Sequence, residues 1–408
     1  MNKTVQDIAI EIGSGITPLR SNELYWNSPD IPWVKTEQLG QYQIYDSTEY
    51  ISDYAAKNTN IRLWPPHTVS VAMYGEGKTR GTVSIFMIRT ATNQACCNII
   101  VNETLADYRF LYYWLKSNYD NLRTLATGVR KNLNSDDIKS FPFPEITLPL
   151  QISIADVLSV LDDKIAINLK ICSELESMAK TLYDYWFVQF DFPAENGRPY
   201  RASGGEMVWN PQLKREIPKE WEVGNLYSIA DFVNGLACQK YRPKDGDPGL
   251  PVIKIKEMHD GITADTEKVS ANIPEKNKVI DGDVLFSWSA TLEVMYWFGG
   301  NGGLNQHIFK VNPKSYFSKE YVFEQLSAYV INFVKMAEAR KTTMGHITTD
   351  HLEQSRIVLP PEAIIEKITL LLHPIHTKIG QLNQENRELI KLRDWLLPML
   401  MNGQARVE

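Results

Sequence analysis

Two short glycine-containing motifs resemble loops that bind nucleotides. The segment AMYGEGKT (72–79) approaches the phosphate-binding pattern GxxxxGKT, but alanine replaces the first glycine, and RGTVSIF, which follows it, is typical of a strand. A phosphate loop needs a helix at that point, because the N-terminal amides of the helix bind the phosphate. The segment FGGNG (298–302) matches the FxGxG loop of S-adenosylmethionine-dependent DNA methyltransferases, yet LNQHIFKV, which follows it, also predicts a strand. Its companion motif, a polar residue before Pro-Pro-aromatic, is missing, since Asn312-Pro313-Lys314 does not match it.

Metal-dependent chemistry is equally poorly supported. Glu76-Gly77-Lys78 has the form of half a nuclease site, but Pro29-Asp30 lacks the sequence context of the second ligand that such a site needs. His373 and His376 lie three residues apart on a predicted helix without a cysteine partner, which favours solvated helix positions over a metal pair. Cys96-Cys97 lies in a β-type run and is interpreted as core. We therefore predict no catalytic or metal site in this chain, and no bound cofactor.

The overall composition is that of a soluble globular protein with more than one domain. The chain has 408 residues, of which 43% are apolar and 23% charged. No signal peptide is recognisable, the apolar run 368–372 is too short to cross a bilayer, and four cysteines without framework spacing suit a reducing cytoplasm. We expect a cytoplasmic protein without a membrane partner. The net charge of −6 argues against a uniformly basic nucleic-acid binder, although local basic patches remain compatible with it.

A long internal repeat is the strongest feature of the sequence. After Pro149, apolar residues alternate at steps of four and three, which is typical of a coiled-coil seam. The seam positions are Ile154, Leu158, Leu161, Ile165, Asn168, Cys172, Leu175, Ala179, Leu182 and Trp186. At a constant shift of 214 residues the second half has Ile368, Leu372, Ile375, Ile379, Leu382, Asn386, Leu389, Arg393, Leu396 and Leu400.

Matching segments precede both heptad stretches in the same order. IGSG (12–15) corresponds to FVNG (232–235), and IPWVKTEQL (31–39) corresponds to LPVIKIKEM (250–258). ATNQACC (91–97) corresponds to GGLNQHIF (302–309), and LNSDDI (133–138) corresponds to ITTDHL (347–352). The shifts drift between 212 and 220 residues, as loop insertions produce. The chain therefore contains two copies of a domain followed by a long helix.

We predict an α+β fold with a domain at 1–146, a long helix at 147–190, a Pro- and Gly-rich linker at 191–218, a second domain at 219–358 and a second long helix at 359–408. Each domain mixes strands with one helix. The strands are expected at 69–74, 82–88, 284–288 and 307–311, and the helices at 106–119 and 318–339.

The two long helices are natural partners, because each must bury its seam. Antiparallel pairing would relate the halves by an approximate twofold axis. A helix over 149–187 spans about 55 Å, whereas DNA turns once in roughly 34–36 Å, so the coil can hold two domains over sites about one turn apart. Asn168 and Asn386 either fix the register of the seam or occupy a hydrated position.

The sequence resembles the specificity (S) subunit of type I restriction-modification systems over essentially its whole length. The resemblance is carried by LDDKIAINLKICSELESMAKTLYDYWF (161–187), by GRPYRASGGEMVWNPQLKREIPKEWEV (197–223), by LFSWSATLEVMYWFGGNGGLNQHIFKV (285–311) and by LRDWLLPMLMNGQARV (392–407).

This resemblance implies two target recognition domains that read the two parts of a split, asymmetric sequence in double-stranded DNA. It also implies that the helices dock two modification (methyltransferase) subunits, and that restriction (translocase and nuclease) subunits join them. S-adenosylmethionine, ATP and Mg are then expected on the partner subunits, and the chain itself is a non-catalytic subunit.

Candidate DNA-binding residues are those whose side chains read base edges or hold phosphates. In the first copy they are Lys35, Lys78, Thr79, Arg80, Asn93, Gln94, Arg130, Lys131 and Asn132. In the second copy they are Lys254, Ser287, Trp288, Ser289, Asn305, Gln306, His307, Lys341, Thr342, Thr343 and His346. Asn93-Gln94 and its counterpart can instead be structural, because they recur in copies that read different sequences.

Three alternatives remain open at this point. YDYWFVQFDF (183–192) packs the helix end onto the linker, which we favour, or contributes to a partner interface. As a whole, the chain could also be a stand-alone DNA methyltransferase or nuclease, or a coiled-coil scaffold that binds proteins but no nucleic acid.

Overall fold

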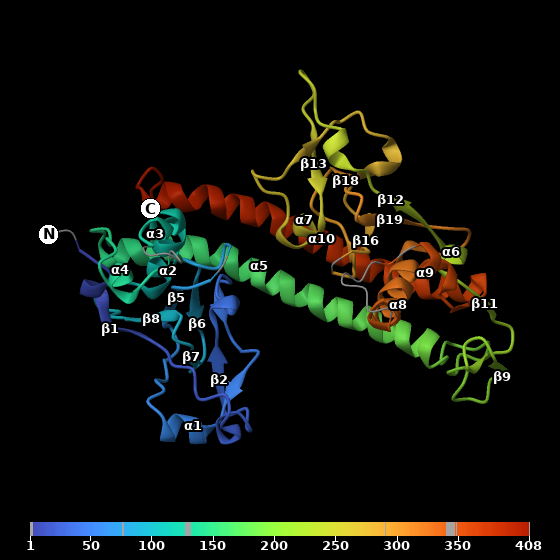
Figure 1. Cartoon of the computed structure of the whole chain (residues 1–408), viewed down its shortest axis with the longest axis horizontal. Coiled ribbons are helices and arrows are strands. Elements are labelled where there is room, and N and C mark those ends of the chain that lie inside the picture. The colour runs from blue at the N-terminus through green and yellow to red at the C-terminus, as the bar shows by residue number, and fades with distance from the viewer. Residues whose placement is uncertain are drawn as a thin grey trace. The chain divides into compact units, whose positions relative to one another are not determined.

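The computed structural model describes residues 3–75, 77–126, 132–289, 291–339, 347 and 349–407. The chain forms two compact units. Unit 1 comprises Met1–Ile165 and Leu389–Glu408, and unit 2 comprises Ala166–Glu388. Each unit therefore contains one of the repeated domains together with part of each long helix (Figure 1).

Unit 1 is built on a five-stranded sheet of order β1-β8-β5-β6-β3. These strands are β1 (Ala9–Ser14), β3 (Gln43–Ile44), β5 (Val69–Ala72), β6 (Val83–Phe86) and β8 (Cys96–Val101). Every residue of β5 and β6 is buried, and apart from Phe86 these strands consist of small and β-branched residues. The strands predicted at 69–74 and 82–88 are confirmed, each slightly shorter than expected.

Helix α2 (Tyr108–Ser117) covers this sheet with Phe110 and Leu111. It begins where Asp107 accepts hydrogen bonds from the backbone amides of Arg109 and Phe110, an N-cap arrangement. The helix predicted at 106–119 is in fact shorter, because the chain turns at Asn118 and continues as α3 (Tyr119–Thr124). A second, three-stranded sheet has the order β4-β2-β7, with β2 (Ile31–Val34), β4 (Tyr50–Ile51) and β7 (Ala91–Thr92). Helices α1 (Asp53–Asn58) and α4 (Ser135–Lys139) complete the domain.

Unit 2 contains two four-stranded sheets, of order β12-β19-β16-β17 and β14-β13-β18-β15. The first consists of β12 (Ala230–Asn234), β16 (Val284–Ser287), β17 (Glu293–Tyr296) and β19 (Ile308–Pro313), and the second of β13 (Leu250–Ile253), β14 (Lys268–Val269), β15 (Lys278–Val279) and β18 (Gly302–Leu304). Its helices are α6 (Leu226–Ile229), α7 (Ile255–Asp260), α8 (Lys319–Ala339) and α9 (Thr349–Gln354), and β11 (Glu222–Gly224) pairs with β20 (Ile357–Leu359). The strands predicted at 284–288 and 307–311 and the helix predicted at 318–339 are confirmed.

The sequence repeat corresponds to a repeat of strand pairings. In unit 1, β2 pairs in parallel with β7, and β1 pairs antiparallel with β8. In unit 2, β13 pairs in parallel with β18, and β12 pairs antiparallel with β19. These are the matched segments of the sequence, so the two domains share these strand pairings, while their sheets differ in the strands at the edges.

A glycine marks the same close approach in both domains. A Cβ atom on Gly15 would lie 1.9 Å from the carbonyl oxygen of Thr92, and one on Gly235 would lie 2.1 Å from the carbonyl oxygen of Asn305. No side chain fits at such distances, because even the smallest would overlap the backbone. The repeated glycine therefore allows the segment after β1 or β12 to touch the loop before β8 or β19.

The long helices are α5 (Leu148–Tyr183) and α10 (Glu362–Met401). Within unit 2, Asn168 donates to Asn386 at 2.9 Å, and the thiol of Cys172 lies near the carbonyl oxygen of Ile379. From Asn168 to Cys172 the chain moves forward along α5, whereas their partners move backward along α10, from Asn386 to Ile379. The predicted antiparallel pairing is confirmed here, and the burial of both asparagines (0% and 5% exposed) favours the interpretation that they fix the register.

The same pairing holds within unit 1. Ile154 and Leu158 of α5 share a core cluster with Leu397 and Leu400 of α10. The larger part of the predicted seam is buried. The half-buried seam residues are Leu161, Leu175, Leu182, Leu389, Arg393 and Leu396.

A buried ion pair occupies one step of this seam. Arg393 donates to Asp162 at 2.6 Å, and the hydroxyl of Tyr113 donates to the other carboxylate oxygen at 2.8 Å. The side chains of Asp162 and Arg393 are 3% and 14% exposed. Arg393 breaks the apolar heptad pattern, and Asp162 is the reason that an arginine can be buried there.

The aromatic segment 183–192 packs into the core of unit 2. Trp186, Phe187, Phe190 and Phe192 are buried, and Phe192 stacks on Trp221 at a ring distance of 4.9 Å. The favoured packing interpretation is confirmed. The segment predicted as a linker (191–218) carries a β-hairpin, β9 (Met207–Asn210) with β10 (Arg215–Pro218), whose Ile217 belongs to the same core. Its Pro- and Gly-rich composition did not predict a packed element. In the described part of the chain, no helix is both long and apolar enough to span a membrane.

Candidate nucleic-acid interface

Lys254 lies at the junction of β13 and α7 in unit 2. Its backbone amide donates to the Glu257 carboxylate at 3.2 Å, which caps the short helix. Its ammonium forms an ion pair with Glu267 at 2.9 Å. Glu267 is fixed by the chain on the other side, because its carbonyl oxygen accepts from the backbone amide of Val252 at 2.8 Å. The pair is thus positioned by backbone hydrogen bonds at both residues.

The loop between β18 and β19 lies beside this pair. The side-chain oxygen of Asn305 accepts from the backbone amide of His307 at 3.2 Å, a local turn that orients the loop. The backbone amide of Asn305 donates to Ile253 at 3.1 Å, and that of Gln306 donates to Leu236 at 2.9 Å. Asn305 is 9% exposed, so it serves as scaffold, whereas Gln306 and His307 are half-buried.

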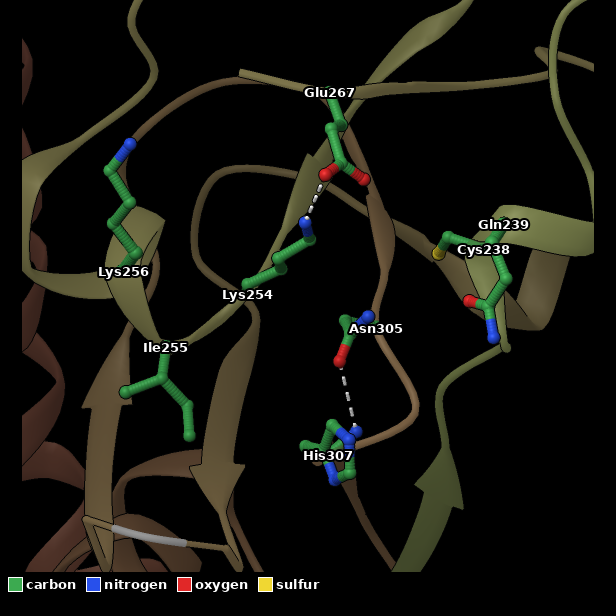
Figure 2. Close-up of a pocket in the computed structure, with 8 residues that line it drawn as sticks. All are labelled: Cys238, Gln239, Lys254, Ile255, Lys256, Glu267, Asn305 and His307. Carbon is green, nitrogen blue, oxygen red and sulfur yellow. Dashed lines mark hydrogen bonds and ion pairs between the residues drawn. The ribbon is translucent and has the colours of Figure 1, made fainter. Parts of the chain in front are cut away.

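These residues line a pocket of about 340 Å³, which we call the Lys254 pocket. Its lining residues are Cys238, Gln239, Lys254, Ile255, Lys256, Glu267, Asn305 and His307. Figure 2 shows the Lys254 ammonium reaching Glu267 on one side, with Asn305 and His307 across the pocket and Gln239 beside them. The lining is therefore a mixture of hydrogen-bond donors and acceptors, as base edges require.

The charges around the pocket are mostly basic. The hydrogen bond from Lys254 lowers the pKa of Glu267, and the Arg242 charge lowers it further, so that Glu267 stays ionised at neutral pH. The preceding segment exposes Lys240, Arg242 and Lys244. Burial raises the pKa of the Cys238 thiol to about 11, so this thiol stays protonated. Local positive charge thus exists in a chain whose net charge is −6.

Unit 1 repeats the ion pair with more partners. Lys35, the counterpart of Lys254, pairs with Glu49 at 2.6 Å and with Glu37 at 2.5 Å, and Arg20 also pairs with Glu49 at 2.6 Å. The hydrogen bonds that the Lys35 ammonium donates to the Glu37 and Glu49 carboxylates raise the pKa of Lys35. The backbone amide of Trp33 donates to the Glu49 carbonyl oxygen at 2.8 Å, as Val252 does to Glu267. Two lysines and two glutamates of the domains are therefore equivalent, but the pair in unit 1 is enclosed by additional charges.

The Asn-Gln dipeptide of unit 1 also repeats the loop geometry. Asn93 accepts from the backbone amide of Ala95 at 3.1 Å, and its own amide donates to Val34 at 3.1 Å. Gln94 is exposed and accepts from the Thr17 hydroxyl at 2.6 Å. Both asparagines therefore support the same local turn, which favours for them the structural alternative that the sequence left open.

The turn between β5 and β6 carries Lys78, Thr79 and Arg80. Helix α3 supports it, because the Tyr119 hydroxyl donates to the Lys78 carbonyl oxygen at 2.6 Å and Arg123 donates to that of Gly77 at 2.9 Å. Lys78 is exposed, whereas Thr79, Arg80 and Asn132 are half-buried. A strand follows the GEGKT segment and another follows FGGNG, as predicted.

Two neighbouring residues that were predicted to bind DNA are buried. Ser287 is 0% exposed, and its hydroxyl donates to the Thr291 carbonyl oxygen at 2.6 Å. The prediction that it contacts DNA is therefore wrong in this structure, because Ser287 ends the buried strand β16. Ser289 is also buried (8% exposed), and Trp288 is half-buried with its ring 5.5 Å from that of His307. Six further predicted residues, Arg130, Lys131, Lys341, Thr342, Thr343 and His346, lie outside the described residues.

The cysteine and histidine pairs that the sequence offered as possible metal ligands have other contacts in the structure. Cys96 and Cys97 are buried in β8, as interpreted. His373 contacts Glu320 at 2.8 Å, and His376 faces Glu324 at 3.2 Å. His376 is only 7% exposed, so the interpretation of both histidines as solvated is wrong for His376. Within the described ranges, no cluster of three or more His, Cys, Asp or Glu side chains suitable for a metal occurs.

Sequence reasoning missed the acidic half of the ion pair, Glu49 and Glu267, and the pocket residues Gln239 and Lys256. Carboxylates were not among the residue types expected to contact DNA, which are mainly donors and amides. Extending the match of IPWVKTEQL with LPVIKIKEM would have found the glutamates, since 49 and 267 keep nearly the same shift as 35 and 254.

Comparison with known proteins decides the family. The family model described as type I restriction modification DNA specificity domain matches residues 1–177 and 218–391. The chain belongs to this family. The two matched regions correspond to the two copies of the repeat. Each region begins with a globular domain and ends within a long helix.

Individual members of the specificity family match over most of the chain. The MjaIX specificity subunit of Methanocaldococcus jannaschii is 25% identical over 100% of this chain and 93% of its own length. The HindI specificity subunit of Haemophilus influenzae is 24% identical over 74% of this chain and 78% of its own length. The crystal structure of the type I restriction-modification S subunit from M. genitalium has a TM-score of 0.56 at 16% identity, covering 98% of this chain and 95% of that one, which shows a shared fold.

Proposed function

We propose that this chain is the DNA-recognition subunit of a type I restriction-modification complex. The observation that carries the proposal is the double match of the specificity-domain family to two domains that share a parallel strand pairing. Each domain then reads one part of a split, asymmetric DNA site. The different charges around the equivalent lysines, Glu37 in one copy and Lys256 in the other, support different sequences for the two parts.

The paired helices α5 and α10 are proposed to dock two modification subunits, with restriction subunits joining the assembly. Methyl transfer and ATP-dependent cleavage, with S-adenosylmethionine, ATP and Mg, then belong to the partners, and this chain works without a catalytic centre of its own. Exposed apolar side chains on both helices support a docking role, among them Ile167 and Leu370, which are 56% and 77% exposed.

The test is methylation mapping in a host that expresses this chain together with its modification subunits. We expect one bipartite asymmetric sequence to be methylated, and no methylation when either gene is omitted. Methyl transfer by the isolated chain would indicate a stand-alone enzyme instead. Failure of the chain to bind DNA in a salt-dependent manner, alone or in the complex, would indicate a protein scaffold.

Modularity provides a second test. Replacing residues 219–358 by the corresponding domain of a relative should change one half of the methylated sequence and spare the other, because separate sites contribute nearly additively. A hybrid that methylates DNA but changes both halves would contradict the assignment of one domain to each half.

A further inference from the structure

The Lys254 pocket contains a cation and an anion in contact, Lys254 and Glu267. Unit 1 has an ion pair at the equivalent position. Lys254 and Glu267 are joined at 2.9 Å, and their side chains are 37% and 67% exposed. An ammonium has three donors and a carboxylate about four acceptor positions. The contact between them uses one donor, so each group keeps hydrogen-bonding capacity toward a ligand.

The major-groove edge of a G·C base pair has the complementary pattern. Guanine presents the acceptors O6 and N7, and the N4 amino group of cytosine presents a donor next to O6. Lysine is a usual partner of guanine, and glutamate of the cytosine amino group. A lysine donor beside a glutamate acceptor therefore matches the guanine and the cytosine of one base pair.

We infer that the Lys254 pocket reads a G·C base pair in the major groove, with the Lys254 ammonium donating to guanine and the Glu267 carboxylate accepting from cytosine N4. The inference rests on the proposed function and names the recognition chemistry of one domain. A T·A pair presents thymine O4 and the adenine amino group in the same order, but thymine has a methyl group where guanine has N7, so T·A is second best. A·T and C·G pairs place the groups in the reverse order and are rejected.

The equivalent pair in unit 1 has a different role. Glu37 and Arg20 complete a closed set of charges around Lys35 and Glu49, whose side chains are only 25% and 28% exposed. At the position of Glu37, unit 2 has Lys256, which cannot close the set. One framework position thus stabilises the domain in one copy and is open to a ligand in the other.

The test uses the complex of the full chain with its modification subunits, once the methylated sequence of the wild type is known. Duplexes substituted at each position in turn compete for binding. The wild type should prefer G·C at one position of one half-site by about 5- to 150-fold. Lys254→Met, which keeps the aliphatic stem, and Glu267→Ala should each abolish most of that preference and leave every other position unchanged.

Lys256→Ala is the matched control from the same pocket. If Lys256 contacts phosphate, its loss weakens binding to all sequences equally and reduces the log–log salt slope by about 0.9, without altering the G·C preference. The same uniform effect in Lys254→Met would overturn the inference, since it would make Lys254 a phosphate contact. Unchanged preferences in both Lys254→Met and Glu267→Ala would overturn it as well, while the proposed function would stand. A wild-type complex that methylates no defined sequence would instead refute the proposed function.

Discussion

The buried ion pair between Asp162 and Arg393 leads to a quantitative prediction. Arg393→Ala should lower the free energy of unfolding of unit 1 by about 3–5 kcal/mol, because it leaves Asp162 charged, buried and deprived of its cation. Asp162 is 3% exposed, and the Tyr113 hydroxyl at 2.8 Å can compensate only part of that charge. Replacing both partners by apolar residues, as in Asp162→Leu with Arg393→Met, should restore most of the loss, since neither partner is then left buried and unpaired. Asp394, which also pairs with Arg393, is 56% exposed and loses little.

Urea unfolding gives the size of the effect, and hydrogen exchange measured by mass spectrometry localises it. Peptides within 148–165 and 389–401 should lose protection in Arg393→Ala, whereas those within 166–183 should change less. Lys180→Ala is the control, because it removes an exposed pair with Asp184 and should cost at most about 0.5 kcal/mol. A cost near that of the control in Arg393→Ala, or a double variant no more stable than the single one, would refute the reasoning.

Three further predictions concern the seam, the repeated glycine and the tyrosine. Replacing Asn168 and Asn386 together by leucine should raise the unfolding midpoint but permit other helix registers, detectable as additional products when engineered cysteines in α5 and α10 are cross-linked. Gly235→Ala should destabilise unit 2 by about 1–3 kcal/mol in thermal unfolding and alter base preference in one half-site, because the new methyl group meets the backbone of Asn305; an unchanged melting temperature would contradict the close approach. Tyr113→Phe should cost about 1.5–3 kcal/mol in urea unfolding by removing a hydrogen bond to a charged group, and a cost below about 0.5 would mean that water replaces it.

The sequence was sufficient for the architecture because the repeat supplied an internal comparison. Segments that match at shifts of 212–220 residues form equivalent strand pairs in the structure, and the two heptad stretches form two antiparallel helices. The repeat also placed Lys35 and Lys254 at equivalent positions, which the structure shows as equivalent ion pairs.

Three features depend on tertiary contacts that residue type alone does not reveal. Ser287 is polar and follows an apolar run, but it is still inside the sheet and bonds to the backbone. The segment 191–218 has the composition of a linker, yet buried aromatic contacts fix it on unit 2. Glu267 is acidic, so its residue type alone did not suggest a DNA contact. The structure shows it paired with Lys254 in the pocket.

The division of the long helices between the units has a consequence for synthesis on the ribosome. The core of unit 1 contains Leu397, Leu400 and Met401 of α10, which contact the same cluster as Ile154 and Leu158. These residues are translated only after the whole of unit 2. The core of the first domain is therefore incomplete until the last segment of the chain is made. Until then, an apolar strip of α5 stays exposed to solvent. A transcript cut short before codon 389 would leave that strip exposed, and so would mark its product for chaperones and proteases rather than for assembly.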